Sequence, residues 1–264
     1  MSQRVQLTID NAVATVRMSR PDKRNALDAE MFEGLIQMGK RIIADQSIRA
    51  VVLHGEGKAF CAGLDFASFL GSPALMQKLL TRTNESPANM AQRAAWVWQE
   101  VKVPVIAAVH GTAFGGGLQI ALGADLRYVT ADAQLSIMEI KWGLIPDMSI
   151  TQTLLKLVPI DVAKELTFTG RIVSGTEAVA LGLATRVADD PLTSALDTAK
   201  LIASKSPHAI RAAKALLGDA PGMSRADALE LETTLQVPLL GSPNQVEAVQ
   251  ANMMKREPSF KDPD

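Results

Sequence analysis

Two carboxylates, Glu139 and Asp147, are the residues of this sequence whose type and spacing most directly suggest chemistry. They lie eight residues apart (147 − 139 = 8) in a stretch that is otherwise largely apolar. The apolar residues beside and between them are Met138, Trp142, Leu144 and Ile145. A cleft lined by such side chains would raise the pKa of a carboxyl group toward the range in which it can accept and return a proton. Residues of this type could take part in acid–base chemistry, but their spacing alone does not assign a base.

A run of three glycines, Gly115–Gly117, stands directly before an apolar helical pattern. Free N–H groups at a helix N-terminus lie at the positive end of the helix dipole and favour negative charge. Phosphate motifs do not fit, because no G-x-x-x-x-G-K-[ST] occurs and Ile120 takes the last glycine position of G-x-G-x-x-G. A second small-residue loop, "KAFCAGLDF", could bring the N–H near Gly63 and Leu64 to the same oxygen. The loops predict an oxyanion site, with tight helix packing as the alternative reason for the glycines.

Each candidate side chain also has a structural interpretation. Glu139 could be a solvated loop acid or an ion-pair partner, and Asp147 could be the N-cap of a helix beginning near Ser149. Gln119, just inside the glycine-led helix, is expected to make a hydrogen bond across the pocket. Trp142 is expected in the pocket wall or the core.

Nucleophilic and metal chemistry receive little support from the composition. The chain has one cysteine, Cys61, and three histidines, so an intrachain disulfide is impossible and soft metal ligands are few. Cys61 has no evident activating neighbour, and no G-x-S-x-G motif occurs. We therefore expect no metal, a packing role for Cys61 and a structural role for His54.

Local patterns indicate the elements that must position these residues. Apolar and polar residues alternate in "VQLTID" and "AVATVRM", with Asn11 between them, which predicts a hairpin. Asp28 is a good N-cap for a helix over Ala29–Ala44.

Buried strands precede both loops, "IRAVVLHG" ahead of the first and "VIAAVHG" ahead of the glycines. Further helices are expected over Met90–Val101, about 150–157, about 160–168 and Thr176–Leu181. From residue 191 onward only helical patterns occur, broken by prolines. We therefore predict an α/β fold, with a core domain over 1–190 and an all-helical region over 191–264.

The composition weighs against nucleic acids and membranes as binding partners. The 264 residues carry a formal net charge of -1 and 4% aromatic residues, which weighs against nucleic-acid binding. The N-terminus lacks a signal-peptide pattern, and the longest apolar stretch is too short to span a bilayer. We expect a cytoplasmic enzyme or binding protein, with neither nucleic acid nor membrane as a partner.

Together these motifs make the sequence resemble the crotonase, or enoyl-CoA hydratase/isomerase, superfamily. The resemblance lies in "KAFCAGLD" and "VPVIAAVHGTAFGGGLQIALGADLRY", and it extends through "RPDKRNALD", "GLIPD" and "TGRIVSGTEAVALGLATRV". It implies a spiral of repeated β-β-α units, with C-terminal helices that assemble a homotrimer or a hexamer made of two trimers. It also implies an acyl-CoA thioester as substrate and no separate cofactor, since coenzyme A is part of that substrate.

The resemblance also implies roles for particular residues. Family members hold the thioester carbonyl oxygen with two backbone N–H groups, here those of Leu64 and Gly116, and so stabilise an enolate. The implied substrate-pocket residues are Ala62, Asp65, Gln119 and Trp142. The implied contacts with CoA are Lys23, Arg24 and Ala26, where the two basic side chains could meet phosphates or form a solvated loop.

The acids indicate which reaction of the family to expect. The hydratases resemble this chain but carry glutamates at the positions of both Gln119 and Glu139, so one acid is replaced here by an amide. Some enoyl-CoA and dienoyl-CoA isomerases have an acid at the position of Asp147. Because a double-bond shift needs only one well-placed carboxylate, we predict isomerisation by Asp147 or Glu139.

Two alternatives remain from the sequence. One is an enoyl-CoA hydratase or related lyase that uses Glu139, with water held by Gln119 or Asp147. The other is a catalytically weak member that binds acyl-CoA and serves a partner or RNA role.

Overall fold

The computed structural model describes residues 4–69, 73–82 and 86–263, and within these residues the strands form two sheets. The larger sheet has the strand order β1-β2-β3-β4-β6-β9, and the smaller has the order β5-β7-β8. The strands of the larger sheet are β1 (Val5–Asp10), β2 (Val13–Met18), β3 (Ala50–Gly55), β4 (Val105–Val109), β6 (Leu126–Val129) and β9 (Arg186–Val187). Those of the smaller sheet are β5 (Thr112–Phe114), β7 (Gln134–Ser136) and β8 (Val173–Ser174).

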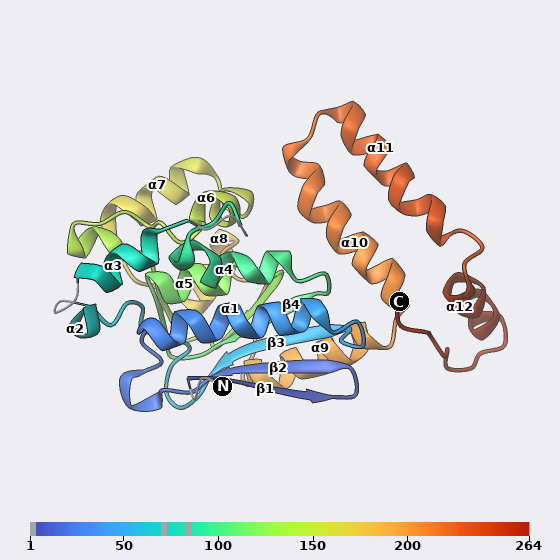
Figure 1. The fold of residues 1–264 in the computed structure, drawn as a ribbon, viewed down its shortest axis with the longest axis horizontal. Coiled ribbons are helices and arrows are strands. Elements are labelled where there is room, and N and C mark those ends of the chain that lie inside the picture. The colour runs from blue at the N-terminus through green and yellow to red at the C-terminus, as the bar shows by residue number, and fades with distance from the viewer. Residues whose placement is uncertain (1–3, 70–72, 83–85, 264) are drawn as a thin grey trace.

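Helices surround the sheets and then extend beyond them toward the C-terminus (Figure 1). The helices up to residue 203 are α1 (Ala29–Ala44), α2 (Phe66–Phe69), α3 (Pro73–Leu80), α4 (Met90–Glu100), α5 (Gly116–Leu122), α6 (Ile150–Thr153), α7 (Ile160–Thr169), α8 (Gly175–Leu181) and α9 (Pro191–Ala203). The later helices are α10 (Pro207–Asp219), α11 (Arg225–Gln236) and α12 (Pro243–Met253). Short 3-10 turns lie at Pro21–Lys23, Glu139–Trp142, Leu154–Lys156, Ala220–Gly222 and Val237–Leu239.

The predicted hairpin and the first predicted helix are both present. β1 and β2 pair antiparallel around a turn in which Asn11 and Ala12 have φ values of 48° and 65°. Such positive angles give the tight turn whose twist matches that of the strands. Asp28 caps α1 by accepting a hydrogen bond from the Met31 backbone N–H at 2.9 Å, as the sequence predicts.

The larger sheet is covered on both faces, which explains its nearly continuous apolar strands. Alternate residues of a strand point to opposite faces, so Val51 and Leu53 of β3 pack with α1 and α4, whereas Val52 packs with α9. The face against α9 is lined by the small residues Ala195, Ala199 and Ala203 of that helix.

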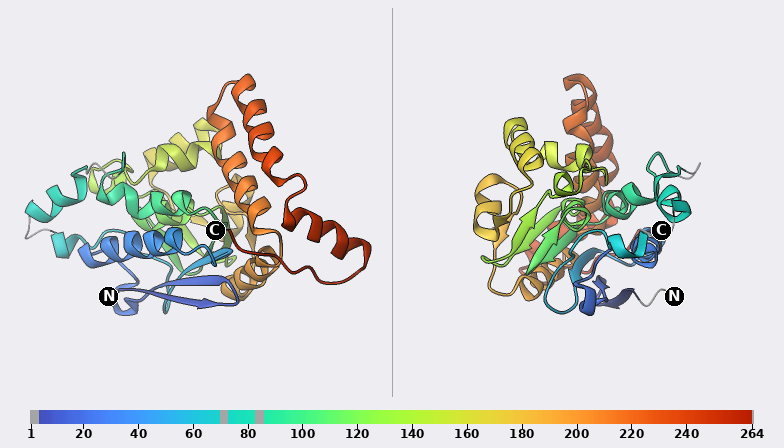
Figure 2. Two further views of the ribbon diagram at one scale, coloured as in Figure 1. Left: turned by 45° about the vertical axis from the view of Figure 1, so that its right-hand side comes forward. Right: turned by 90° about the vertical axis from the view of Figure 1, so that its left-hand side faces the viewer.

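The C-terminal helices project from this body. Figures 1 and 2 show α10 and α11 side by side and pointing away from the sheets, with α12 at the far end. Lys214 of α10 ties this region to the body, because its ammonium donates to the backbone oxygens of Trp98 and Val103 and lies 2.7 Å from the Asp125 carboxylate. The chain end then returns to the body, where Arg49 pairs with Asp262 at 2.6 Å.

The predicted α/β region followed by helices is confirmed, with some differences in detail. The division at residue 190 stays a prediction, and by its packing α9 belongs to the body. The helix expected over 150–157 is the one-turn α6 followed by a 3-10 turn. Of the mixed segment from 72 to 101, residues 72 and 83–85 lie outside the described residues. Within the described residues, none of the helices is both long and apolar enough to cross a membrane.

Candidate active site

The two predicted loops meet edge to edge. The Cys61 N–H donates to the Thr112 oxygen at 3.0 Å, and the Phe114 N–H donates to the Cys61 oxygen at 3.0 Å. Glycine is required at the contact, because a Cβ on Gly117 would lie 2.4 Å from the Cys61 oxygen. Gly63 has φ +87°, and a Cβ there would lie 2.7 Å from the Phe114 oxygen. The absence of side chains at these glycines therefore lets the start of α5 pack directly against the first loop.

The two residues predicted to supply backbone amides, Leu64 and Gly116, line the same pocket. Gly116 is the first residue of α5, so its N–H has no acceptor one turn earlier in the helix. The residues beside Leu64 are held in place, because the Gly63 oxygen accepts from the Leu27 N–H at 2.8 Å and the Asp65 N–H donates to the Leu27 oxygen at 3.0 Å. Within the described part of the chain, neither the Leu64 nor the Gly116 N–H donates a hydrogen bond. Both residues line one pocket, where their amides are free to bind an oxygen.

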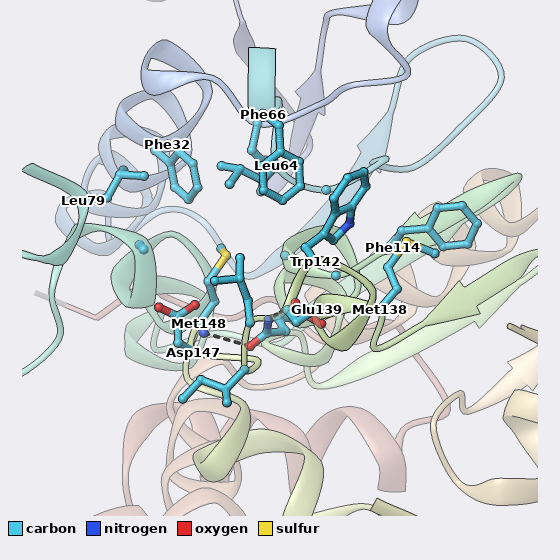
Figure 3. A pocket seen from close by; sticks show the side chains of 18 of the residues that line it. Phe32, Leu64, Phe66, Leu79, Phe114, Met138, Glu139, Trp142, Asp147 and Met148 are labelled. Carbon is cyan, nitrogen blue, oxygen red and sulfur yellow. Dashed lines mark hydrogen bonds between the residues drawn. The ribbon is translucent and has the colours of Figure 1, made fainter. Parts of the chain in front are cut away.

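This pocket has a volume of about 270 Å³ and mostly apolar walls (Figure 3). It is lined by all four apolar residues that the sequence placed around the carboxylates: Met138, Trp142, Leu144 and Ile145. Trp142 lies against Phe66, with 4.5 Å between the ring centroids. Phe32 of α1 and Leu79 of α3 form the wall across the pocket from the carboxylates (Figure 3).

Glu139 is the more enclosed of the two acids in the pocket. Its Oε1 accepts a hydrogen bond from Gln119 Nε2 at 2.7 Å. Its Oε2 is buried and has no hydrogen-bond partner among the described residues. Burial raises the pKa of Glu139, and the negative charge of Asp147 raises it further, while the backbone N–H of Glu139 itself and the Gln119 hydrogen bond act in the opposite direction. No ion pair of Glu139 is present in the described structure, so the ion-pair alternative is not supported.

Asp147 also lines the pocket; the residue is open to solvent, and partial burial of its carboxyl group raises its pKa above the usual value. The alternative that Asp147 caps a helix is wrong. α6 begins at Ile150, and Ser149 occupies the N-cap position with φ 66° and without a side-chain cap. The positive φ of Ser149 turns the chain between the acid and the helix, so the Asp147 carboxylate is left for the pocket.

Gln119 makes the hydrogen bonds across the pocket that the sequence predicts. The residue is 1% exposed. Besides donating to Glu139, its amide accepts from the Met148 N–H through Oε1 at 2.8 Å. These two bonds are the dashed lines in Figure 3.

The remaining predicted pocket residues differ in where they lie. Ala62 lines the pocket. Asp65 is not among the lining residues, because its carboxylate lies 2.8 Å from Arg20 Nη1 and accepts from the Ser68 hydroxyl at 2.8 Å. The same Arg20 side chain donates to the Ala26 oxygen at 3.0 Å. Asp65 therefore joins the first loop to the preceding segment instead of facing the pocket.

The segment implied to contact CoA runs alongside the first loop. The Ala62 N–H donates to the Arg24 oxygen at 2.9 Å, and the side chains of Lys23 and Arg24 are exposed. Asn25, which the sequence analysis did not single out, holds this segment in place. It is 0% exposed, and its Nδ2 donates to the backbone oxygens of Glu56 and Ala59. The sequence signal that could have indicated this role of Asn25 is a polar residue directly before the apolar "AL" of "RPDKRNALD".

The sulfur and the imidazole groups near the loops have structural contacts. Cys61 is buried, its thiol donates to the Asn25 oxygen at 3.1 Å, and burial raises its pKa to about 12. A thiol with this pKa is not a nucleophile near neutral pH. The ring of His110 lies 2.9 Å from the Gly57 oxygen, outside the pocket lining.

Comparisons with known proteins agree with this geometry. A family model described as Enoyl-CoA hydratase/isomerase matches residues 8–263. The chain is 32% identical over 259 residues to the mitochondrial Delta(3,5)-Delta(2,4)-dienoyl-CoA isomerase of Mus musculus, covering 93% of this chain and 77% of that protein. It is 32% identical over 248 residues to the enoyl-CoA hydratase EchA19 of Mycobacterium tuberculosis, covering 93% and 92%.

Solved structures extend the agreement to the fold. The crystal structure of an enoyl-CoA hydratase from Bacillus anthracis matches with a TM-score of 0.90 and 29% identity, over 98% of this chain and 99% of that chain. The similarity confirms the predicted crotonase-like α/β fold with C-terminal helices.

Proposed function

The chain belongs to the enoyl-CoA hydratase/isomerase family, and we propose that within it the protein shifts a carbon–carbon double bond of an enoyl-CoA or dienoyl-CoA thioester. One observation carries the proposal. Two carboxylates, Glu139 and Asp147, line the same apolar pocket as Leu64 and Gly116. The third polar side chain there, Gln119, is an amide and cannot transfer a proton near neutral pH.

Substrate binding follows from the chemistry of the pocket. The thioester carbonyl oxygen accepts from the Leu64 and Gly116 N–H groups, and the acyl chain lies among the apolar walls. The phosphates of CoA meet the exposed basic side chains of Lys23 and Arg24, which lie on the segment bonded to the first loop. CoA is part of the substrate, so the reaction needs no separate cofactor.

Proton transfer then moves the double bond. An ionised carboxylate takes a proton from the α carbon, and the electron pair of that C–H bond moves toward the thioester oxygen, forming an enolate. The two amides stabilise the negative charge on that oxygen, an effect for which one donor typically contributes about 100- to 1000-fold in rate. The proton returns to the γ carbon of a 3-enoyl chain, giving the 2-enoyl product, or to the ε carbon of a 3,5-dienoyl chain, giving the 2,4-dienoyl product.

The presence of two acids favours the longer proton shift. One carboxylate can serve both the α and the γ carbon, but the α and ε carbons are farther apart along the chain. With Glu139 and Asp147 both in the pocket, one can accept a proton while the other, protonated, donates one. The similarity to the mouse Delta(3,5)-Delta(2,4)-dienoyl-CoA isomerase supports testing dienoyl substrates first.

Water addition is the second candidate, because EchA19, which is named a hydratase, is as similar in identity as the mouse isomerase. It would use Glu139 with a water held by Gln119 or Asp147. The amide oxygen of Gln119 already accepts from Met148, and its nitrogen already donates to Glu139. Its remaining capacity to hold a water is therefore reduced, which weighs against hydration.

Three substrates separate the two reactions. The purified protein is incubated with a 3-enoyl-CoA, a 3,5-dienoyl-CoA and a trans-2-enoyl-CoA, and the products are separated by chromatography. Isomerisation converts the first two into their conjugated isomers. Exclusive formation of a hydroxyacyl-CoA from the third would overturn the proposal in favour of hydration.

We also propose that the protein assembles as a homotrimer, or as a hexamer of two trimers, through its C-terminal helices. Support comes from apolar side chains that α11 and α12 expose in the single chain. They are Leu229, Val246, Val249 and Met253. Four exposed apolar side chains on the same two helices provide surface that a neighbouring subunit could cover.

A further inference from the structure

Gln119 occupies a central place among the groups that the proposed reaction needs. It lies on α5 three residues after Gly116, the first residue of that helix. Its side chain is buried and makes one hydrogen bond to Glu139 and one to the backbone of Met148. Because Met148 directly follows Asp147, the Gln119 side chain connects α5 to the segment of Glu139 and to the segment of Asp147.

The orientation of this amide is determined by its partners. The Met148 N–H can only donate, so the atom facing it at 2.8 Å must be the amide oxygen. The amide nitrogen must therefore face Glu139, where it donates to Oε1 at 2.7 Å. The side chain of Met148 also lies close to α5, since a Cβ on Gly116 would lie 2.6 Å from the Met148 sulfur.

The two oxygens of Glu139 are consequently not equivalent. Oε1 is engaged by a donor, whereas Oε2 is buried and has no partner among the described residues. A donated hydrogen bond stabilises negative charge on Oε1, so the proton of the neutral acid is favoured on Oε2.

We propose that Gln119 is the positioning residue of this site: its amide fixes the orientation of the Glu139 carboxyl, with the proton of the neutral acid on Oε2, and holds the backbone next to Asp147 against α5. The inference rests on the proposed function, because it specifies how the same site holds its acids. Gln119 itself transfers no proton. This role explains why a polar residue, Gln119, lies near the start of the otherwise apolar helix α5.

The charged groups around Glu139 determine what the loss of Gln119 would do. Asp147, from the segment across the pocket, raises the pKa of Glu139, and burial raises it more. Lys141, on the same 3-10 turn, has its ammonium 5.8 Å from the Trp142 ring centroid. The Gln119 hydrogen bond is the side-chain interaction that lowers the pKa of Glu139, so removing the donor must raise it.

The test replaces the amide by an apolar side chain of similar length, Gln119→Met, in the full chain. The matched control is Gln99→Met, because Gln99 Nε2 donates to the Gly123 oxygen at 2.6 Å, at the other end of the same helix and outside the pocket lining. The titration of Glu139 is followed by carbon-13 NMR of labelled glutamate carboxyls, and the Glu139→Gln variant identifies the resonance. We expect the Glu139 pKa to rise in Gln119→Met and to stay at the wild-type value in Gln99→Met.

A second measurement follows enolate formation without a double-bond shift. Exchange of the α proton of a saturated acyl-CoA in deuterated buffer is expected to slow about 100-fold in Gln119→Met, the usual effect of misplacing a catalytic group by about 1 Å. Gln99→Met should exchange at the wild-type rate. If Gln119→Met does not fold, Gln119→Glu replaces it, because that side chain keeps an acceptor for Met148. The two adjacent carboxyl groups must then share a proton, which raises the apparent pKa of the pair.

The outcomes separate the two proposals. An unchanged Glu139 titration in a folded Gln119 variant, or an unchanged exchange rate, overturns the role of Gln119. A raised Glu139 pKa with slowed exchange, in a protein that does not isomerise enoyl-CoA or dienoyl-CoA, supports the role of Gln119 and overturns the proposed function.

Discussion

Glu139 is subject to opposing influences on its pKa, and their balance predicts how activity depends on pH. We propose its ionised form as a base of the reaction, and its pKa is raised by burial and by Asp147. Activity must therefore fall as the pH decreases through this raised pKa. Asp147→Asn removes one source of the increase, so the acidic limb of kcat/KM should move to lower pH while the rate on the plateau drops.

Measurement of kcat/KM between about pH 4 and about pH 9 for wild type and Asp147→Asn checks this expectation. Asp132→Asn provides the matched control, because this exposed aspartate lies outside the pocket lining. An acidic limb that stays in place in Asp147→Asn would mean that Asp147 does not act on the base.

The same raised pKa predicts a pH-dependent effect on stability. The folded protein binds the Glu139 proton more tightly than the unfolded chain does, so ionisation of Glu139 opposes folding. This cost is absent below the unfolded value of about 4.3 and grows as the pH rises to the folded pKa. Glu139→Gln removes the cost, so its Tm relative to wild type should be higher at about pH 8 than at about pH 4.

Thermal unfolding followed by circular dichroism at the two pH values measures this difference. Glu257→Gln is the control, because Glu257 is exposed, lies outside the pocket lining and forms none of the ion pairs of the described residues. Equal Tm differences at both pH values for Glu139→Gln would show that Glu139 ionises in the folded protein as it does in the unfolded chain.

The sequence indicated the acids of the site but not the contacts between them. Glu139 and Asp147 stood out because relatives in the family that the sequence resembles have acids at these two positions. The hydrogen bond from Gln119 to Glu139 spans 20 residues, and the bond from Met148 to Gln119 spans 29. Such bonds depend on how separate segments pack, and local patterns carry no information about that packing. For the same reason Asp65 was expected in the pocket, although it pairs with Arg20.

The start of α5 positions the amide that we propose to bind the oxyanion, and Gly117→Ala tests this placement. The added Cβ would lie 2.4 Å from the Cys61 backbone oxygen, which cannot move without parting the two loops. We expect kcat/KM to fall about 100-fold, because the Leu64 and Gly116 amides separate, and stability to fall by about 1–3 kcal/mol.

Gly218→Ala is the matched control for this prediction, since a Cβ on Gly218 of α10 meets nothing within 4 Å. It should leave kcat/KM unchanged and increase stability by about 0.5–1 kcal/mol, as alanine does in a helix. Steady-state kinetics and urea unfolding measure both quantities. Wild-type kinetics in Gly117→Ala would mean that the contact between the loops does not position the amides.

Elements with a strong local signal were predicted well, and the others were not. The cap at Asp28 and the periodic apolar residues of α1 specify that helix from nearby residues alone. The strands β5, β8 and β9 are two or three residues long, so their pairing depends on distant partners instead of a repeating pattern. α6 begins directly after Ser149, which has a positive φ. The sequence pattern had suggested Asp147 as the N-cap of this helix.

At the scale of the whole molecule, the sequence predicted an α/β body followed by C-terminal helices. It did not predict which of these helices pack on the body. α9 is helical like its successors, yet its small residues Ala195 and Ala199 fit it against the larger sheet. α10 is held to the body by the ammonium of Lys214, whose contacts come from positions 89 to 116 residues earlier in the chain. Beyond this contact α11 and α12 extend outward, which leaves their apolar side chains exposed unless another copy covers them (Figure 2).

That exposed surface predicts self-association, which Leu229→Glu and Val249→Glu test together. Leu229 on α11 is 56% exposed and Val249 on α12 is 46% exposed, so neither side chain supports the fold of its own subunit. A carboxylate placed between subunits would be buried without a partner and would oppose assembly. Sedimentation velocity should show wild type as a trimer or hexamer of the 28.2 kDa chain and the double variant as smaller species with unchanged circular dichroism. Glu230→Gln and Gln250→Glu, at exposed polar positions of the same two helices, should keep the wild-type assembly, whereas a monomeric wild-type protein would overturn the prediction.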